Sequence, residues 1–361
     1  MALRARHVKA INSLSATQLD AGRDESMHAL SPYRELKATV LAAGLLRKQP
    51  WYYFGLILAL FSLLSCGLAA LFVTPAFPLQ LADAVFLAFV FTQLGLLGHD
   101  AGHNQVFNSH RWNTILGRVC GNLLLGMGLD WWREHHNAHH ASPNQEGRDP
   151  DADIGVLALS AEQAARRRGF ERWCNRWQVF LTPLFASLEV FWLYRYTVGF
   201  LVSHRSRSRY LEALLIAAHF ALSLAVPFIA LGVAHGLLFA LVQRVVSGWY
   251  MNVIFGANHV GMPILSRTQQ MDFVQQQVTT SRNVRLPRGL AFLFGGLNLQ
   301  IEHHLFPTMP RNQLRRAQPI VKAFCLRNGL SYRESGFAAT YLEMFTHLWR
   351  VSRLVPSREI T

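Results

Sequence analysis

The sequence has few cysteines and few charged residues for its length. Only four of its 361 residues are cysteine, and they are so widely spaced that no Cys-x-x-Cys pair occurs. This argues against a disulfide framework, an iron–sulfur cluster and a zinc ribbon. Charged residues make up 16% of the chain and hydrophobic residues 51%, a balance that is unusual for a soluble protein. The composition predicts a membrane protein.

Apolar runs long enough to cross a bilayer come in two pairs. The run from Trp51 to Val73 contains no charged residue, and the next, from Leu79 to Gly98, contains only Asp83. A second pair extends from Glu212 to about Leu231 and from Gly236 to about Ala257, and each pair is joined by a turn of only four or five residues. This pattern predicts an all-α, multi-pass membrane protein with four transmembrane helices in two hairpins.

The excess of basic residues fits this topology. The chain has 35 Lys+Arg against 21 Asp+Glu, yet neither short turn contains a basic residue and only Arg244 lies inside a predicted span. By the positive-inside rule, both termini and the segment from His99 to Tyr210 are expected in the cytosol. Because lipid would not tolerate the charge of Arg244, we expect this side chain to face the bundle interior and to pair with Asp83. The basic residues are spread over three segments without a recognisable motif, which argues against nucleic-acid binding.

These observations divide the chain into three parts: a cytosolic N-terminal segment (1–48), a membrane domain (49–310) and a cytosolic C-terminal segment (311–361). Two further apolar segments are ambiguous. Residues 115–129 are too short to span and are expected to form an interfacial or re-entrant helix. Residues 178–203 are long enough, but periodicity alone leaves open whether they cross the membrane. Arginine outnumbers lysine 31 to 4, which by association suggests a bacterial gene and hence a bacterial cytoplasmic membrane.

Histidine is unusually common, with 16 residues in the chain. Seven of them form three tight clusters: His99 and His103; His136, His139 and His140; His303 and His304. Helix positions three or four residues apart share a face, so each cluster presents its imidazoles in one direction. His259, where the last apolar run ends, is a natural eighth member on the same side. Eight imidazoles exceed what one zinc ion needs, so two metals are indicated, and the residue type leaves zinc, copper, iron and nickel open.

The three clusters resemble the histidine boxes of the integral-membrane fatty acid desaturases. They are HDAGH at 99–103, HNAHH at 136–140 and QIEHHLFP at 300–307. Together with the hairpins, the resemblance covers most of the chain. It implies a cytosolic helical cap that carries the boxes, a non-haem di-iron centre, and O₂-dependent insertion of a double bond into an acyl chain. The two iron ions would be bound by His99, His103, His136, His139, His140, His259, His303 and His304.

One position departs from many members of that family, because Gln300 stands where the third box often begins with histidine. This variant resembles the front-end desaturases and several bacterial acyl-CoA desaturases. The amide oxygen of Gln300 can bind iron or hold a coordinated water, and Asn258, beside His259, is a second candidate to hold such a water. Carboxylates that can orient ligand imidazoles lie in or beside the boxes, although 149–151 also fits an ordinary turn. They are Asp100, Glu134, Asp149, Asp151, Asp153 and Glu302.

The resemblance also implies partners, because reduction of O₂ consumes two electrons from outside the acyl chain. The sequence has no His-Pro-Gly-Gly haem motif, no Rossmann glycine fingerprint and no cysteine cluster. A separate ferredoxin, or a cytochrome with its reductase, is therefore expected. The acyl carrier is left open between coenzyme A, acyl-carrier protein and a membrane lipid. Candidates to bind its phosphates are Arg166, Arg167, Arg168, Arg172 and Arg176, together with Arg315 and Arg316.

Two other functions remain open at this point. A di-iron membrane hydroxylase of lipids or alkanes would share the histidine boxes and insert oxygen instead, although QIEHHLFP favours desaturation. A metal or proton transporter would place histidines inside the spans, whereas these clusters lie at or beyond the span ends.

Overall fold

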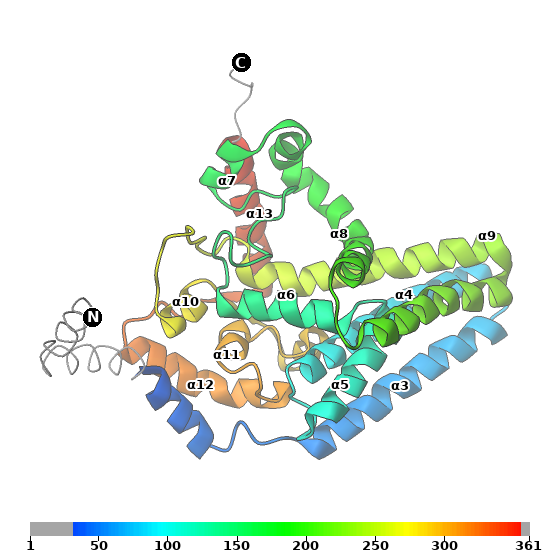
Figure 1. Cartoon of the computed structure of the whole chain (residues 1–361), viewed down its shortest axis with the longest axis horizontal. Helices are drawn as coiled ribbons and strands as arrows, with labels where there is room; N and C mark the ends of the chain where they lie inside the picture. Colours follow the sequence, from blue (N-terminus) through cyan, green and yellow to red (C-terminus); the bar gives the residue numbers. More distant parts are fainter. Residues whose placement is uncertain (1–31, 355–361) are drawn as a thin grey trace, which may run out of the picture.

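The protein is almost entirely helical (Figure 1), as the apolar runs predict. The computed structural model describes residues 32–354, so the expectations for 1–31 and 355–361 concern residues outside the described part. Within 32–354, β-structure is confined to two short strands, β1 (Asn283–Arg285) and β2 (Glu334–Gly336), and one isolated bridge. The two strands pair in parallel, with Val284 opposite Ser335.

Long apolar helices form one end of the molecule (Figure 1). α3 (Pro50–Val73) and α4 (Phe77–Gly102) pack together as the first predicted hairpin. Pro50 and Pro78 each stand in the first turn of their helix, where the missing N–H has no helical partner to lose. Among the described residues, three helices are long and apolar enough to cross a membrane: α3, α4 and α9 (Arg209–His259).

α9 consists of two helices that meet at Gly232, whose φ of 73° and ψ of 171° are not helical. Arg244 Nη2 donates a hydrogen bond to Ser223 Oγ at 2.8 Å. A continuous helix would hold residues 21 positions apart at a separation of about 30 Å. The chain therefore reverses at Gly232, and Figure 1 shows the two halves side by side. The second predicted hairpin is present, with a break at one glycine instead of a four-residue turn.

Arg244 is buried in the bundle as expected, but the prediction that it pairs with Asp83 is wrong. The guanidinium donates to Ala240 O and Ser223 Oγ, and Asp83 Oδ2 is buried without a hydrogen-bond partner. Asp83 lies six residues from the start of α4, whereas Arg244 lies twelve residues beyond Gly232. At 1.5 Å per residue, the two side chains differ in depth by about 9 Å.

The two ambiguous segments are both helical, and neither is among the helices that are long and apolar enough to cross a membrane. Residues 115–129 contain the end of α5 (His110–Arg118), a π-helix, η1 (Val119–Leu125), and a left-handed turn at Gly126. α8 (Gly169–Ser203) contains Pro183 and packs along α9.

Shorter helices gather at the end of the molecule to which the C-terminal ends of α4 and α9 point (Figure 1). They are α6 (Leu129–Ala141), α7 (Ala161–Arg166), α10 (Phe273–Thr279), η2 (Arg288–Phe294), α11 (Gln300–Leu305), α12 (Arg311–Arg327) and α13 (Phe337–Leu354). The helix at 32–42 packs with α10, α11 and α12 in one core, in which Leu36, Ile301, Leu305 and Phe324 are all buried. Burial of each such side chain stabilises the fold by about 1.5–3 kcal/mol and fixes α11, which carries the third histidine cluster.

Candidate metal centre

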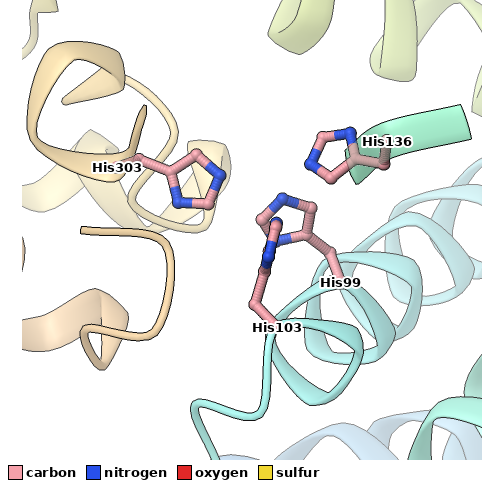
Figure 2. A group of neighbouring side chains, drawn as sticks. All are labelled: His99, His103, His136 and His303. Carbon is pink, nitrogen blue, oxygen red and sulfur yellow. The ribbon is translucent and has the colours of Figure 1, made fainter. Parts of the chain in front are cut away.

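The structure brings together all eight histidines that the sequence singles out. They come from the end of α4, from α6, from the end of α9 and from α11. Two groups can each hold a metal ion, because within each group one ligand atom per residue lies within 4.8 Å of the others. The first group is His99, His103, His136 and His303, whose imidazoles face a common centre in Figure 2. The second group is His139, His259 and His304.

α6 contributes histidines to both groups. His136 turns toward the first group, and His139, three residues later, turns toward the second. His140 lies between them: its Nε2 is 3.1 Å from His136 Nε2, and its ring stacks on His304 with centroids 4.3 Å apart. A single turn of helix thus links the two groups.

Several buried histidine nitrogens at this site have no hydrogen-bond partner and could bind metal ions. Buried polar atoms nearly always have a hydrogen-bond partner. Here both ring nitrogens of His99 and of His303, Nε2 of His103 and Nδ1 of His140 are buried without one. In the first group, an unpartnered nitrogen on each of His99, His103 and His303 is the arrangement that a bound cation would satisfy, since imidazole is a common ligand for iron and zinc.

The second group is oriented by oxygen atoms on the far side of each ring. Nδ1 of His259 lies 3.1 Å from Thr280 O, and Nδ1 of His304 lies 2.8 Å from Gln277 Oε1. A proton on Nδ1 in these bonds leaves the Nε2 lone pair directed at the centre. The sequence analysis missed both partners. Thr280 uses its main-chain carbonyl, and Gln277 lies on α10, outside any histidine motif, so no local pattern points to either.

Two of the predicted carboxylates contact ligand histidines. Asp149 lies 3.0 Å from His139 Nδ1 and also accepts a hydrogen bond from the Asn144 N–H at 2.7 Å. Asp100 Oδ1 is 3.5 Å from His99 Nδ1, while its Oδ2 accepts from Tyr53 and from the Arg311 guanidinium. Asp149 thus hydrogen-bonds a histidine of the second group, whereas His99 Nδ1 has no hydrogen-bond partner, so an orienting role for the two carboxylates stays a prediction.

The remaining carboxylates have other neighbours. Asp151 lies 2.7 Å from His135 Nε2 and 3.6 Å from His139 Nδ1. Asp153 pairs with Arg167, and the exposed Glu134 lies 3.8 Å from His204. Glu302, although inside the third box, accepts hydrogen bonds from Asn283 Nδ2 at 2.7 Å and Tyr332 OH at 2.6 Å. Burial raises the pKa of Glu302 to about 7.

Gln300 lies against the second group, with its nitrogen rather than its oxygen toward the imidazoles. Gln300 Nε2 is 3.0 Å from His304 Nε2 and 3.1 Å from His259 Nε2, while Oε1 accepts a hydrogen bond from Asn258 Nδ2. Asn258 Nδ2 also donates to the Leu297 carbonyl at 3.0 Å, which identifies it as the nitrogen. This differs from the expectation that the Gln300 oxygen faces a metal.

Burial keeps most of the cap histidines neutral, the form that binds metal. Desolvation, together with the repulsion between neighbouring imidazolium ions, lowers the pKa of His136, His140, His303 and His304 well below 6.5. Desolvation also disfavours protonation of His139, but the Asp149 carboxylate outweighs it and raises the pKa of that ring.

The arginines singled out for phosphate binding lie along α7 and the start of α8. Arg166 pairs with Glu146 at 3.0 Å, and Arg167 pairs with Asp153 and, at 3.4 Å, with Glu171. Arg168 directly precedes α8, and Arg172 and Arg176 lie in its first turns. Arg315 and Arg316 lie apart from them, on α12.

An apolar cavity of about 240 Å³ lies inside the bundle formed by α3, α4, η1, α8 and α9. Leu71, Leu87 and Phe91 are among its apolar lining residues, and Met251 lines it about two turns before His259. Arg244 contributes polar atoms to its wall. The lining suits an apolar ligand.

Comparison with known proteins agrees with this geometry. Residues 76–336 match the family model described as fatty acid desaturase. An acyl-lipid (9-3)-desaturase of Physcomitrium patens is 30% identical over 92% of this chain, which spans only 65% of that protein. A delta(5) fatty acid desaturase of Caenorhabditis elegans is 30% identical over 93% of this chain and 77% of its own length. A delta(8)-fatty-acid desaturase of Euglena gracilis is 31% identical over 84% of this chain and 75% of its own length. Since the family match covers most of the chain, the protein belongs to the fatty acid desaturase family.

Proposed function

We propose that the protein is an O₂-dependent desaturase that introduces a double bond into a fatty acyl chain. The observation that carries this proposal is the pair of imidazole groups, with buried unpartnered nitrogens, at one end of a helical bundle that encloses an apolar cavity. Relatives named as desaturases support the same activity.

The residues that would hold two iron ions follow from the two groups. His99, His103, His136 and His303 would hold one ion, and His139, His259 and His304 the other, with His140 between them. Bound iron would supply the chemistry that activates O₂ toward C–H bonds. Asp149, Gln277 and the Thr280 carbonyl would keep the rings of the second group in the tautomer that binds metal.

The rest of the chain would position the substrate and exclude water. The apolar cavity would hold part of the acyl chain, and the chain would extend past Met251 to bring a pair of neighbouring methylenes to the histidines. Two C–H bonds break and one C=C bond forms. O₂ accepts the two hydrogens together with two electrons from the external donor and two protons from solvent, and leaves as two waters. The donor in this proposal is a separate ferredoxin, or a cytochrome with its reductase.

The proposed location is a membrane, spanned by α3, α4 and the two halves of α9, with the histidine cap and both termini in the cytosol. The absence of basic residues from the turns at 74–76 and 232–235 supports this orientation. A bacterial cytoplasmic membrane fits the arginine-rich composition. The acyl carrier, whether coenzyme A, acyl-carrier protein or lipid, is not chosen by these observations.

The experiment is expression in a host of defined lipid profile, with the site of any new double bond located by mass spectrometry. A new double bond that is absent from a matched His304→Ala culture supports desaturation. A hydroxylated acyl chain in its place would favour the hydroxylase alternative. An unchanged lipid profile, together with metal flux into vesicles that contain the protein, would favour a transporter.

A further inference from the structure

A second pocket, of about 480 Å³, lies on the opposite side of α4 from the apolar cavity. Phe91 lines the apolar cavity, whereas Gln93 lines this pocket. Two residues along a helix differ by about 200° in direction, so the two side chains leave α4 on opposite faces. A chain bound in the apolar cavity would have to cross α4 to enter the second pocket. The second pocket is therefore a separate site.

Both polar and apolar side chains line this pocket. Arg285 of β1 and Asn312 and Arg315 of α12 contribute polar side chains, while Leu56 of α3 and Phe292 of η2 contribute apolar ones. A pocket of this kind suits an amphiphile, whose charged head and hydrocarbon part need different surroundings.

Exposed aromatic residues indicate that the pocket lies at the level of the membrane surface. Phe292 is 58% exposed, and Trp51, one residue before the lining residue Tyr52, is 84% exposed at the start of α3. Tryptophan and other amphipathic rings at the end of a span mark the boundary between headgroups and hydrocarbon. The ligand that reaches a pocket at this depth most directly is a membrane lipid.

The charge in the pocket is not neutralised by the protein. Arg311 pairs with Asp100, and Glu334 pairs with Lys322, so these lining charges are compensated. Arg285 and Arg315 have no carboxylate within 4.0 Å among residues 32–354, unlike Arg166 and Arg167 near α7. Two positive charges therefore face the pocket. Guanidinium groups bind phosphate through paired hydrogen bonds, which makes a phosphate ester the matching head group.

We propose that this pocket binds the phosphate of an anionic membrane phospholipid as a lipid site separate from the acyl cavity. Arg285 and Arg315 hold the phosphate, and Leu56 and Phe292 contact the adjoining hydrocarbon. Arg311 forms part of the same pocket and donates to Asp100, the carboxylate beside His99. A bound phospholipid thus rests against Arg311, whose partner Asp100 lies beside His99, and ties the cap to the membrane surface.

The test uses the full chain in nanodiscs of phosphatidylcholine with a fixed fraction of phosphatidylglycerol. Native mass spectrometry after transfer to detergent counts the phosphatidylglycerol molecules that remain bound. The double variant Arg285→Gln with Arg315→Gln should bind this lipid about 30-fold more weakly than wild type, at about a factor of five per arginine. The control is Arg205→Gln with Arg207→Gln, which removes the same charge from the exposed loop between α8 and α9.

Retention equal to wild type in the Arg285/Arg315 variant would overturn the proposal, as would an equal loss in the control. Coenzyme A provides the comparison between phosphate sources. Displacement of phosphatidylglycerol by soluble coenzyme A in wild type, but not in the variant, would assign the pocket to the acyl carrier and overturn the lipid assignment. The lipid count requires no turnover, so it stands or fails independently of desaturase activity. Size-exclusion profiles that match wild type would show that both variants fold.

Discussion

Asn258 Nδ2 donates a hydrogen bond to Gln300 Oε1 at 3.1 Å, and this bond decides which end of the Gln300 amide faces the histidines. Because Asn258 Nδ2 is also bound to two main-chain carbonyls, the pair cannot exchange donor and acceptor without losing these bonds. Gln300 therefore offers N–H groups, not a lone pair, to the space between His259 and His304.

The first prediction concerns this pair. Gln300→Ala should lower desaturation while leaving the iron content close to that of wild type, because an amide N–H positions groups near the metal without binding it. Asn258→Ala should have a smaller effect in the same direction. If Asn258 acts through Gln300, the double variant should lose no more than Gln300→Ala alone. Losses that simply add would mean that the two residues act independently.

The second prediction tests the histidines themselves. His103→Ala, His139→Ala, His259→Ala and His304→Ala should each reduce product formation by about 100-fold or more, because each removes a ligand that no neighbour can replace. Wild-type protein should contain about two irons per chain, and each variant fewer, by elemental analysis. The matched control is His235→Ala, which lies just after the break at Gly232, far along the second half of α9 from His259, and should keep both iron and activity. An active protein that holds only zinc would contradict the assignment.

The third prediction separates the two groups. Asp149→Asn removes the carboxylate that holds His139 but leaves the first group untouched. Loss of such an orienting partner typically costs 10–100-fold in metal affinity. Iron content should therefore fall from about two ions per chain toward one. A titration of the metal-free variant with iron should show one class of binding site. The control is Asp153→Asn, which removes a partner of Arg167 and should keep both iron ions.

The fourth prediction concerns the stability of the metal-free protein. The pKa values of His136, His140, His303 and His304 are lowered in the folded state, so below about pH 6.5 the unfolded chain binds more protons than the folded one. Stability should therefore fall as the pH drops from 7.5 to 5.5. His139 and Glu302, whose pKa values are raised, act in the opposite direction but are fewer. Thermal unfolding of chelator-treated protein measures this, and a flat profile would contradict it.

The fifth prediction concerns topology. In a background without the four native cysteines, single cysteines at Thr74 and Ala234 should react with an impermeant thiol reagent from outside. Ala234 is preferred to Gly232, because the φ of 73° at Gly232 strains any other side chain. A cysteine at the exposed Ala161 of α7 should react only after the membrane is opened. Labelling of Ala161→Cys in intact cells would exclude the four-span arrangement.

Features that depend on local pattern could be predicted from the sequence alone. Uncharged runs of about 20 residues mark the apolar helices, because a helix must be that long to cross hydrocarbon. The spacing of His136, His139 and His140 fixes a shared helical face, since the period of the helix is a property of the backbone. The same motifs were sufficient to indicate the family.

The tertiary structure alone decided how these elements are used. His136 and His139 belong to different groups because the fold places His136 beside the histidines of α4 and His139 beside His259 of α9, an arrangement that no linear pattern specifies. The Thr280 carbonyl orients His259 from 21 positions away. Arg311, which the sequence assigned to a separate C-terminal segment, bonds to Asp100 beside His99 from 211 positions away. Such contacts depend on long-range packing, and the residues involved carry no local signal of the partner that the fold gives them.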